Sequence, residues 1–231
     1  MNGGLDGTYD GYGESPASAS HLGEISQALS ATLDPRVSND IRQQALQFLE
    51  QVKTEHDAPQ YGFTLAEDYN QNTAVRYYGL QLLEYAVKYR WTKYSEKQAE
   101  QLRFWVKCLA GSIRHQDELY IRNKIAQLWV EVAKRCWGEE WMDMDKLLVT
   151  LWDKSVEEKG FANKVFVLYV LEMLSEDICN REDASAGLRL EVLGSALNEI
   201  IIPQALYEEH LTSRGKSAEV RAGTEGWLAR I

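Results

Sequence analysis

Apolar residues recur with a helical period along most of the chain, beginning at His21. The first expected helix is marked by three apolar residues at helical spacing, Leu22, Ile25 and Leu29. Pro35 prevents this helix from continuing far. A Ser38-Asn39-Asp40 cap then opens a second helix over 38–55. By the same spacing, further helices are predicted over 73–91, 94–114, 117–136, 140–153, 161–180 and 186–210.

The secondary structure of two stretches is less clear from their residues. Val165–Leu171 is rich in β-branched and aromatic residues, as a buried strand would be. Apolar residues continue beyond it through Ile178 without a turn signal, so a buried helix is favoured. Residues 55–72 are predicted to be a polar connection, because they contain Pro59 and Gly62. No other segment predicts a strand.

The expected helix AVRYYGLQLLEYAVKYRW, residues 74–91, is apolar on much of its circumference. One stripe consists of Val75, Gly79, Leu82, Ala86 and Tyr89, and a second group widens it, namely Tyr78, Leu80, Leu83, Tyr85 and Val87. An ordinary surface helix has a single apolar face, so this helix must be covered on several sides. We expect Gly79 at a close helix contact, and its replacement by leucine to cost about 1–3 kcal/mol through overpacking.

Pairing the predicted helices indicates an internal repeat. The first members of successive pairs are predicted to begin near residues 21, 73, 117 and 161, and the last two steps are about 44 residues, typical of HEAT repeats. The predicted fold is therefore all-α, a HEAT-repeat solenoid (an α-α superhelix) of about four antiparallel helix pairs. Residues 1–18 are rich in glycine, serine and acidic residues, and we expect them to form a disordered leader.

Composition narrows the function classes. The net charge of −10 argues against bulk attraction to nucleic acid or anionic lipid, although a local basic stripe is compatible with it. Three widely spaced cysteines, Cys108, Cys136 and Cys179, are expected to be reduced, buried thiols in an intracellular protein. No secretory signal and no sufficiently long apolar run is present, so neither secretion nor membrane insertion is expected.

Residues that could carry catalysis or bind metal are scattered. The four histidines, His21, His56, His115 and His210, show no spacing that places two metal ligands on one helix face. There is no phosphate-binding loop and no nucleophile elbow. We therefore expect no catalytic residue, no metal and no cofactor, and the chain is not predicted to be an enzyme.

Two segments carry a family resemblance. Ala74–Trp91 resembles the second-repeat helix in the N-terminal domain of the β-karyopherins, the nuclear transport receptors, and is most similar to their exportin-5 branch. KIAQLWVEVAKRCWGEEWMDM, which begins at Lys124, resembles that branch's third-repeat helix and its paired-tryptophan turn. Ala45–Leu49 and Leu171–Asp177 are also similar in spacing, so the resemblance covers about residues 20–210.

One departure concerns the paired-tryptophan turn. Gly138 and Met142 stand where the family often has proline after each tryptophan, which affects the expected rigidity of the turn but not the fold. Trp137 and Trp141 could form a cargo site, but packing between repeats is the favoured interpretation, since large aromatic side chains bury most of their area in cores.

The resemblance implies a nuclear export receptor that shuttles between nucleus and cytoplasm. Its implied partners are Ran in its GTP form, nuclear pore proteins, and export cargo that is protein, structured RNA such as tRNA, or both. The implied division is a leader at 1–18, N-terminal HEAT repeats with the Ran-binding region at 19–217, and the start of a truncated repeat at 218–231. The alternative is a HEAT-repeat scaffold for protein interactions with no dependence on Ran.

The family places Ran on the concave surface formed by the second helices of the first repeats. The candidate residues on the helices predicted at 38–55 and 94–114 are Arg42, Gln47, Glu50, Lys53, Gln98, Gln101 and Lys107. Ordinary solvated surface is the alternative role for each of them. The last predicted pair is strongly apolar at 190–202, so we expect a fragment whose uncapped end self-associates or binds hydrophobic dyes.

Overall fold

A computed structural model describes residues 16–136, 143–153 and 158–179 of the chain. These residues form α-helices and one short 3₁₀ helix, and no strand occurs among them. The all-α prediction is confirmed. Val165–Leu171 lies inside the helix Glu158–Cys179, as the absence of a turn signal indicated.

The chain divides into two compact units, Met1–Glu55 and His56–Ile231. The first unit contains α1 (Pro16–Leu33) and α2 (Asn39–Val52), which pack against each other. Its buried apolar side chains come from both helices and are Ile25, Leu29, Ala45, Leu49 and Val52. Ser38 stands at the N-cap of α2, but its side chain makes no capping hydrogen bond.

The start of α1 falls inside the predicted leader. The helix begins at Pro16, and proline fits the first turn of a helix because its nitrogen has no hydrogen to leave unpaired there. The remaining leader residues, 1–15, lie outside the described part of the chain.

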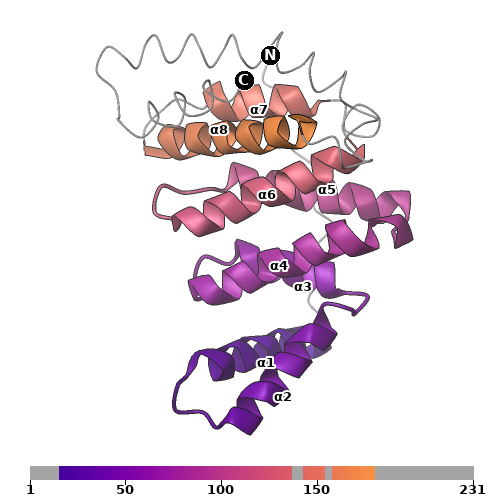
Figure 1. The fold of residues 1–231 in the computed structure, drawn as a ribbon, viewed down its shortest axis with the longest axis vertical. Coiled ribbons are helices and arrows are strands. Elements are labelled where there is room, and N and C mark those ends of the chain that lie inside the picture. The colour runs from indigo at the N-terminus through magenta and orange to yellow at the C-terminus, as the bar shows by residue number, and fades with distance from the viewer. Residues whose placement is uncertain (1–15, 137–142, 154–157, 180–231) are drawn as a thin grey trace. The chain divides into compact units, whose positions relative to one another are not determined.

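The second unit is a stack of helix pairs. Its helices are α3 (Ala58–Glu67), α4 (Thr73–Arg90), α5 (Glu96–Gly111), α6 (Leu119–Cys136), α7 (Met144–Asp153) and α8 (Glu158–Cys179), with the 3₁₀ helix η1 at Trp91–Lys93. Helix α3 pairs with α4, α5 with α6, and α7 with α8. The second helices, α4, α6 and α8, also pack on one another in chain order (Figure 1).

The prediction of a polar connection at 55–72 is wrong, because this segment contains α3. Pro59 lies in the first turn of the helix, where it is tolerated. Gly62 is buried at the contact with α4 and does not break the helix. The missed helix shifts the pairing: α4, α6 and α8, which were expected to open their pairs, are second members.

Two glycines bring α3 and α4 close together. A Cβ atom at Gly79 would lie 2.6 Å from the backbone oxygen of Gly62 and 2.8 Å from the backbone nitrogen of Ala66. A Cβ atom at Gly62 would lie 2.8 Å from the backbone oxygen of Gly79. The expected close contact at Gly79 is therefore confirmed, and its partner is the glycine of the helix that the sequence pattern missed.

Burial on several sides explains the broad apolar surface of α4. Its buried residues are Val75, Arg76, Tyr78, Gly79, Leu80, Leu82, Leu83, Ala86 and Val87. Tyr89, which was placed in the apolar stripe, is 68% exposed. Cys136 is buried as expected and Cys108 is half-buried, whereas the Cys179 side chain lies outside the described ones. None of the described helices is long and apolar enough to cross a bilayer.

Candidate partner-binding surface

The seven predicted Ran-contact residues fall on two helices of different kinds. Arg42, Gln47, Glu50 and Lys53 lie on α2 or directly after it, at the second helix of the first pair. Gln98, Gln101 and Lys107 lie on α5, which is the first helix of its pair. The prediction took these three residues to lie on a second helix, whereas the structure places them on a first helix; their contact with Ran stays a prediction. The cause is the undetected α3, which reversed the order of the helices in the pair that followed.

Several of these residues also have local structural roles. The Arg42 guanidinium donates to the backbone oxygens of Asp34 (3.1 Å) and Val37 (3.3 Å), which holds the turn between α1 and α2. Gln98 completes the capping box of α5 with Ser95. These two side chains therefore contribute to helix ends in addition to any partner contact.

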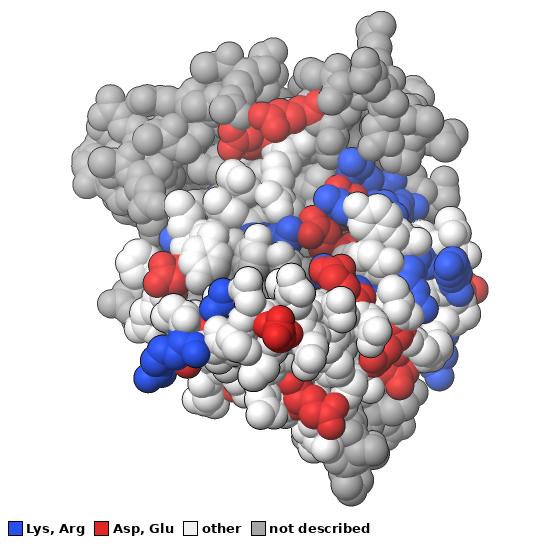
Figure 2. All heavy atoms as spheres, turned by 60° about the horizontal axis from the view of Figure 1, so that its bottom comes forward, with Lys and Arg blue, Asp and Glu red and all other residues white. Residues whose placement is uncertain are grey.

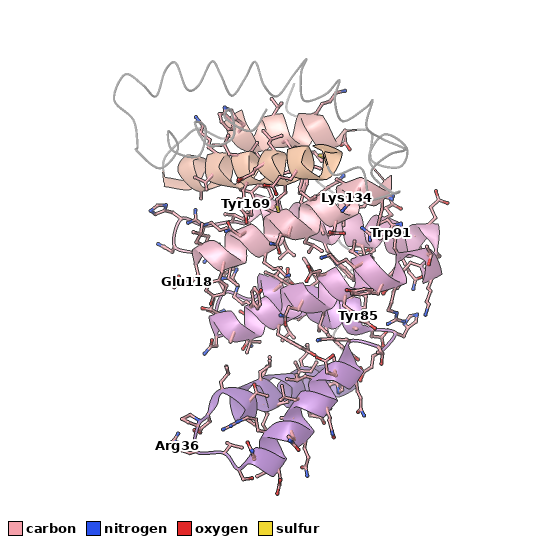
Figure 3. All side chains as sticks on the ribbon, viewed as in Figure 1. Arg36, Tyr85, Trp91, Glu118, Lys134 and Tyr169 are labelled. Atoms are coloured by element: carbon pink, nitrogen blue, oxygen red, sulfur yellow. The ribbon has the colours of Figure 1, made fainter. Side chains whose placement is uncertain are left out.

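The second helices that the structure does place together are α4 and α6. We call the line where their side chains meet the α4/α6 seam. Across it Tyr77 meets Tyr120, Glu84 meets Lys124, and Lys88 lies near Glu131. With their neighbours on the same helices, the members of the seam are Tyr77, Glu84, Tyr85, Lys88 and Tyr89 of α4 and Leu119, Tyr120, Lys124, Glu131, Lys134 and Arg135 of α6. Figure 3 labels Tyr85 on α4 and Lys134 on α6.

Ion pairs cross the middle of the seam. The Lys124 ammonium of α6 contacts the Glu84 carboxylate of α4, which also accepts from Lys88 at 2.9 Å. Lys88 lies 3.7 Å from Glu131, and Arg135 donates to Glu131 at 2.9 Å. These contacts hold the two helices in register through half-buried charges.

The pKa values of the seam follow from these contacts. Burial alone would raise the pKa of Glu84, but hydrogen bonds from Lys124 and Lys88 outweigh it, so the pKa is lowered from its ordinary value of 4.5. Burial would lower the pKa of Lys88, but the hydrogen bond to Glu84 and the charge of Glu131 raise it. Both groups are therefore held in their charged forms at neutral pH.

Aromatic side chains lie at both ends of the seam. Tyr77 and Tyr120 meet edge to face with ring centroids 5.5 Å apart, near the start of the two helices. Tyr85 and Tyr89 contact each other at 5.1 Å toward the end of α4. Leu119 (51%) and Tyr120 (48%) are exposed, as is Tyr89. Large exposed side chains of this kind are enriched where proteins bind one another.

A second polar cluster is buried between α4 and the α5–α6 turn. Arg76 on α4 forms an ion pair of 2.7 Å with Asp117 in the α5–α6 turn, and both side chains are at most 8% exposed. Arg76 also donates to the backbone oxygen of Ala66, and Asp117 accepts from the backbone nitrogen of Arg114. The cluster fastens the second pair to the third.

Tyr69, in the α3–α4 turn, completes this cluster. The guanidinium groups of Arg76 and Arg114 lie over its ring, 4.2 Å and 3.5 Å from the centroid, and its hydroxyl donates to the backbone oxygen of Ser112. Sequence reasoning missed the cluster. Its residues are far apart in the chain, and no short motif joins them.

Charge is mixed on the face of the molecule that Figure 2 draws. Figure 2 shows acidic and basic side chains interspersed among uncharged ones, without one large region of a single sign. Within the described ranges, no group of three or more His, Cys, Asp or Glu side chains is arranged to hold a metal ion.

Comparison with known proteins identifies the segment that contains most of the seam. Residues 45–131 match the family described as Importin-beta N-terminal domain. The chain is 32% identical to Protein MSN5 of Saccharomyces cerevisiae over 89% of its length, and 28% identical to Exportin-5 of Mus musculus over 90%. Exportin-5 of Homo sapiens is 31% identical over 67% of the chain. The chain spans 18%, 18% and 13% of these relatives, respectively.

Proposed function

Because the chain belongs to the β-karyopherins and corresponds to the N-terminal region of the exportin-5 group, we propose that it binds Ran in its GTP form as part of a nuclear export receptor. The observation that supports this best is the domain match at 45–131, which contains α4 and most of α6. The relatives are much longer, so the activity of the whole receptor is proposed for a protein of which this chain is one region.

The proposed contact surface consists of second helices. The α2 candidates Arg42, Gln47, Glu50 and Lys53 are kept, since α2 closes the first pair. The exposed ends of the α4/α6 seam replace the three α5 candidates, because those residues belong to a first helix. Each set lies within one unit, so each can be tested by itself.

A nucleotide-dependent binding assay tests the proposal. Immobilised chain is exposed to Ran loaded with a non-hydrolysable GTP analogue or with GDP, and association is followed optically. We expect binding of the GTP form and at least a tenfold weaker response with GDP, because a contact that depends on the nucleotide state requires different affinities for the two conformations. Equal binding of both forms, or none, would instead favour the scaffold without Ran dependence.

Charge reversal locates the surface. Lys53→Glu at the end of α2 is compared with Lys107→Glu on α5. If second helices form the interface, the α2 variant slows association with Ran-GTP and the α5 variant does not. The opposite result would return the site to the first helices.

Cargo, pore binding and location follow from the same proposal. We propose that the full-length protein carries protein or structured RNA cargo, contacts nuclear pore proteins and shuttles between nucleus and cytoplasm. A tagged full-length protein that stays outside the nucleus when its export is blocked would contradict this proposal.

A further inference from the structure

The turn between α1 and α2 presents a serine hydroxyl close to arginine side chains. Ser38, which precedes α2, is exposed, and its backbone is extended, with φ −61° and ψ 154°. Its side chain makes no capping hydrogen bond to the helix that follows. Arg36 stands two residues earlier, and its side chain is 88% exposed. The hydroxyl and the arginine are therefore both accessible to an enzyme that reads this turn.

Two other exposed hydroxyl groups among the described residues also follow a lysine or arginine by two positions. They belong to Thr92 and Ser95. Thr92 lies in the 3₁₀ helix η1, so its backbone is not extended. The Ser95 hydroxyl donates to Oε1 of Gln98 at 3.0 Å and accepts from the Gln98 backbone nitrogen at 3.4 Å. Of the three, Ser38 alone combines an extended backbone with a hydroxyl that is not engaged in capping.

A second arginine lies at the same turn. One terminal nitrogen of Arg42 donates to the backbone oxygens of Asp34 (3.1 Å) and Val37 (3.3 Å), and Val37 directly precedes Ser38. The Nε atom of Arg42 is buried and has no hydrogen-bond partner among the described residues. Arg36 bonds to the Asp34 carboxylate at 3.1 Å. Exposed ion pairs contribute little to stability, so Arg36 can turn to another anion at small cost.

We propose that Ser38 is a phosphorylation site for serine kinases that recognise arginine two residues before the acceptor. Such kinases bind an extended substrate segment and select it by charge pattern. In the transfer, a bond forms between the Ser38 Oγ atom and the γ-phosphorus of ATP, while the bond from that phosphorus to the β–γ bridging oxygen breaks. ADP leaves, and the hydroxyl proton passes to the catalytic aspartate of the kinase. The inference does not depend on the proposed function, because it requires no transport partner.

A phosphate on Ser38 would change the start of α2. It adds about 1.5–2 negative charges near pH 7, next to the first N–H groups of the helix, which have no acceptor within the helix. These N–H groups, Arg36 and Arg42 can donate charge-assisted hydrogen bonds to it. Asp34 and Asp40 repel it but form no contact with it. The phosphate should therefore hold the first turn of α2 more firmly.

Phosphorylation of the complete chain tests the assignment. The chain is incubated with ATP and the catalytic subunit of a cyclic-nucleotide-dependent protein kinase, which recognises arginine on the N-terminal side of its acceptor, and the phosphate is located by mass spectrometry. We expect phosphate on Ser38, and none at this position in Ser38→Ala. Arg36→Gln should slow the transfer at least about tenfold, because the charge complementarity with the kinase is lost. Ser95→Ala, the matched change at the other cap serine, should leave the rate unchanged.

A synthetic peptide of residues 32–44 separates the contribution of the fold from that of the local sequence. If the peptide is phosphorylated on Ser38 and the folded chain is not, the turn withholds the hydroxyl and the proposal is wrong. Faster transfer to Thr92 or Ser95 than to Ser38 also overturns it. So does the absence of transfer to both the chain and the peptide.

Hydrogen exchange tests the effect of the phosphate on the helix. Amides 39–42 of the phosphorylated chain should exchange about two- to fivefold more slowly than those of the unmodified chain. Arg42→Gln should reduce this protection, because it removes one of the donors to the phosphate. The first turn of α5 is the control and should exchange equally in both forms. Equal exchange of amides 39–42 in the two forms would overturn the predicted contact between the phosphate and the turn.

Discussion

The contact between Gly62 and Gly79 makes a sharp prediction about stability. In Gly79→Ala, the new methyl carbon would lie 2.6 Å from a backbone oxygen and 2.8 Å from a backbone nitrogen of α3. Carbon contacts are ordinarily about 3.5–4.0 Å, so the two helix backbones must separate by about 1 Å. No side-chain rotation can relieve the overlap, because the atoms that are too close belong to backbone.

Two opposing terms set the magnitude. Overpacking of a tight core costs about 1–3 kcal/mol, and a clash with two backbone atoms belongs at the upper end of that range. Alanine gains up to about 1 kcal/mol over glycine in a helix interior. We therefore expect Gly79→Ala to lower the free energy of unfolding by about 2 kcal/mol, which corresponds to about 4–8 °C in Tm for a chain of this size.

Urea unfolding followed by tryptophan fluorescence measures this change. The control is Gly111→Ala at the end of α5, where an added Cβ has no heavy atom within 4 Å and no loss of stability is expected. Gly62→Ala should resemble Gly79→Ala, and the double variant should lose less than the sum of the two, because one separation of the helices relieves both clashes. A Gly79→Ala chain as stable as the wild type would refute the close contact.

Three further predictions concern a buried ion pair and two groups whose pKa is raised. Asp117→Asn leaves the Arg76 guanidinium buried without its counter-charge, so chemical unfolding should show a loss of about 3–5 kcal/mol. Burial raises the pKa of Glu67, so its ionisation opposes folding above the raised value; Glu67→Gln should stabilise the chain at neutral pH, with the gain vanishing as pH falls below 4.5. Burial, and then the charge of Glu67, raise the pKa of the Cys108 thiol, so Glu67→Gln should speed alkylation of Cys108 at pH 8, and an unchanged rate would contradict this coupling.

The pattern of apolar residues was sufficient to predict the helices that have strong periodicity. The helix at Thr73–Arg90 was predicted because its surface is apolar on several sides, and the same property required a stacked fold. The helix at Ala58–Glu67 was not predicted, since Pro59 and Gly62 usually indicate loops. Only the packing shows that Gly62 allows α4 to approach α3 closely. The amino-acid sequence of α3 by itself does not reveal that contact.

The site prediction depended on the order of helices within pairs. The candidate surface was expected on second helices, and because one helix was missed, α5 was counted as a second helix. The Arg76–Asp117 pair was invisible for a different reason: its partners are separated by 41 positions, and a buried charge looks the same in sequence as an exposed one. The predicted helix at 186–210, the paired tryptophans and the predicted apolar end lie outside the described residues.

The rotation of α4 links the glycine contact to the seam. Successive residues of a helix turn by about 100°, so Glu84 and Lys88 lie roughly 140–180° around the helix from Gly79. One side of α4 is therefore committed to α3 through a contact that tolerates no side chain, and the opposite side faces α6 with charged groups. Because Gly79 fixes how α4 is turned, it also fixes which residues reach the seam. Substitutions at Lys88 or Tyr89 can then change partner binding without altering the α3–α4 contact, whereas Gly79→Ala alters the position of α4 while every seam side chain remains present.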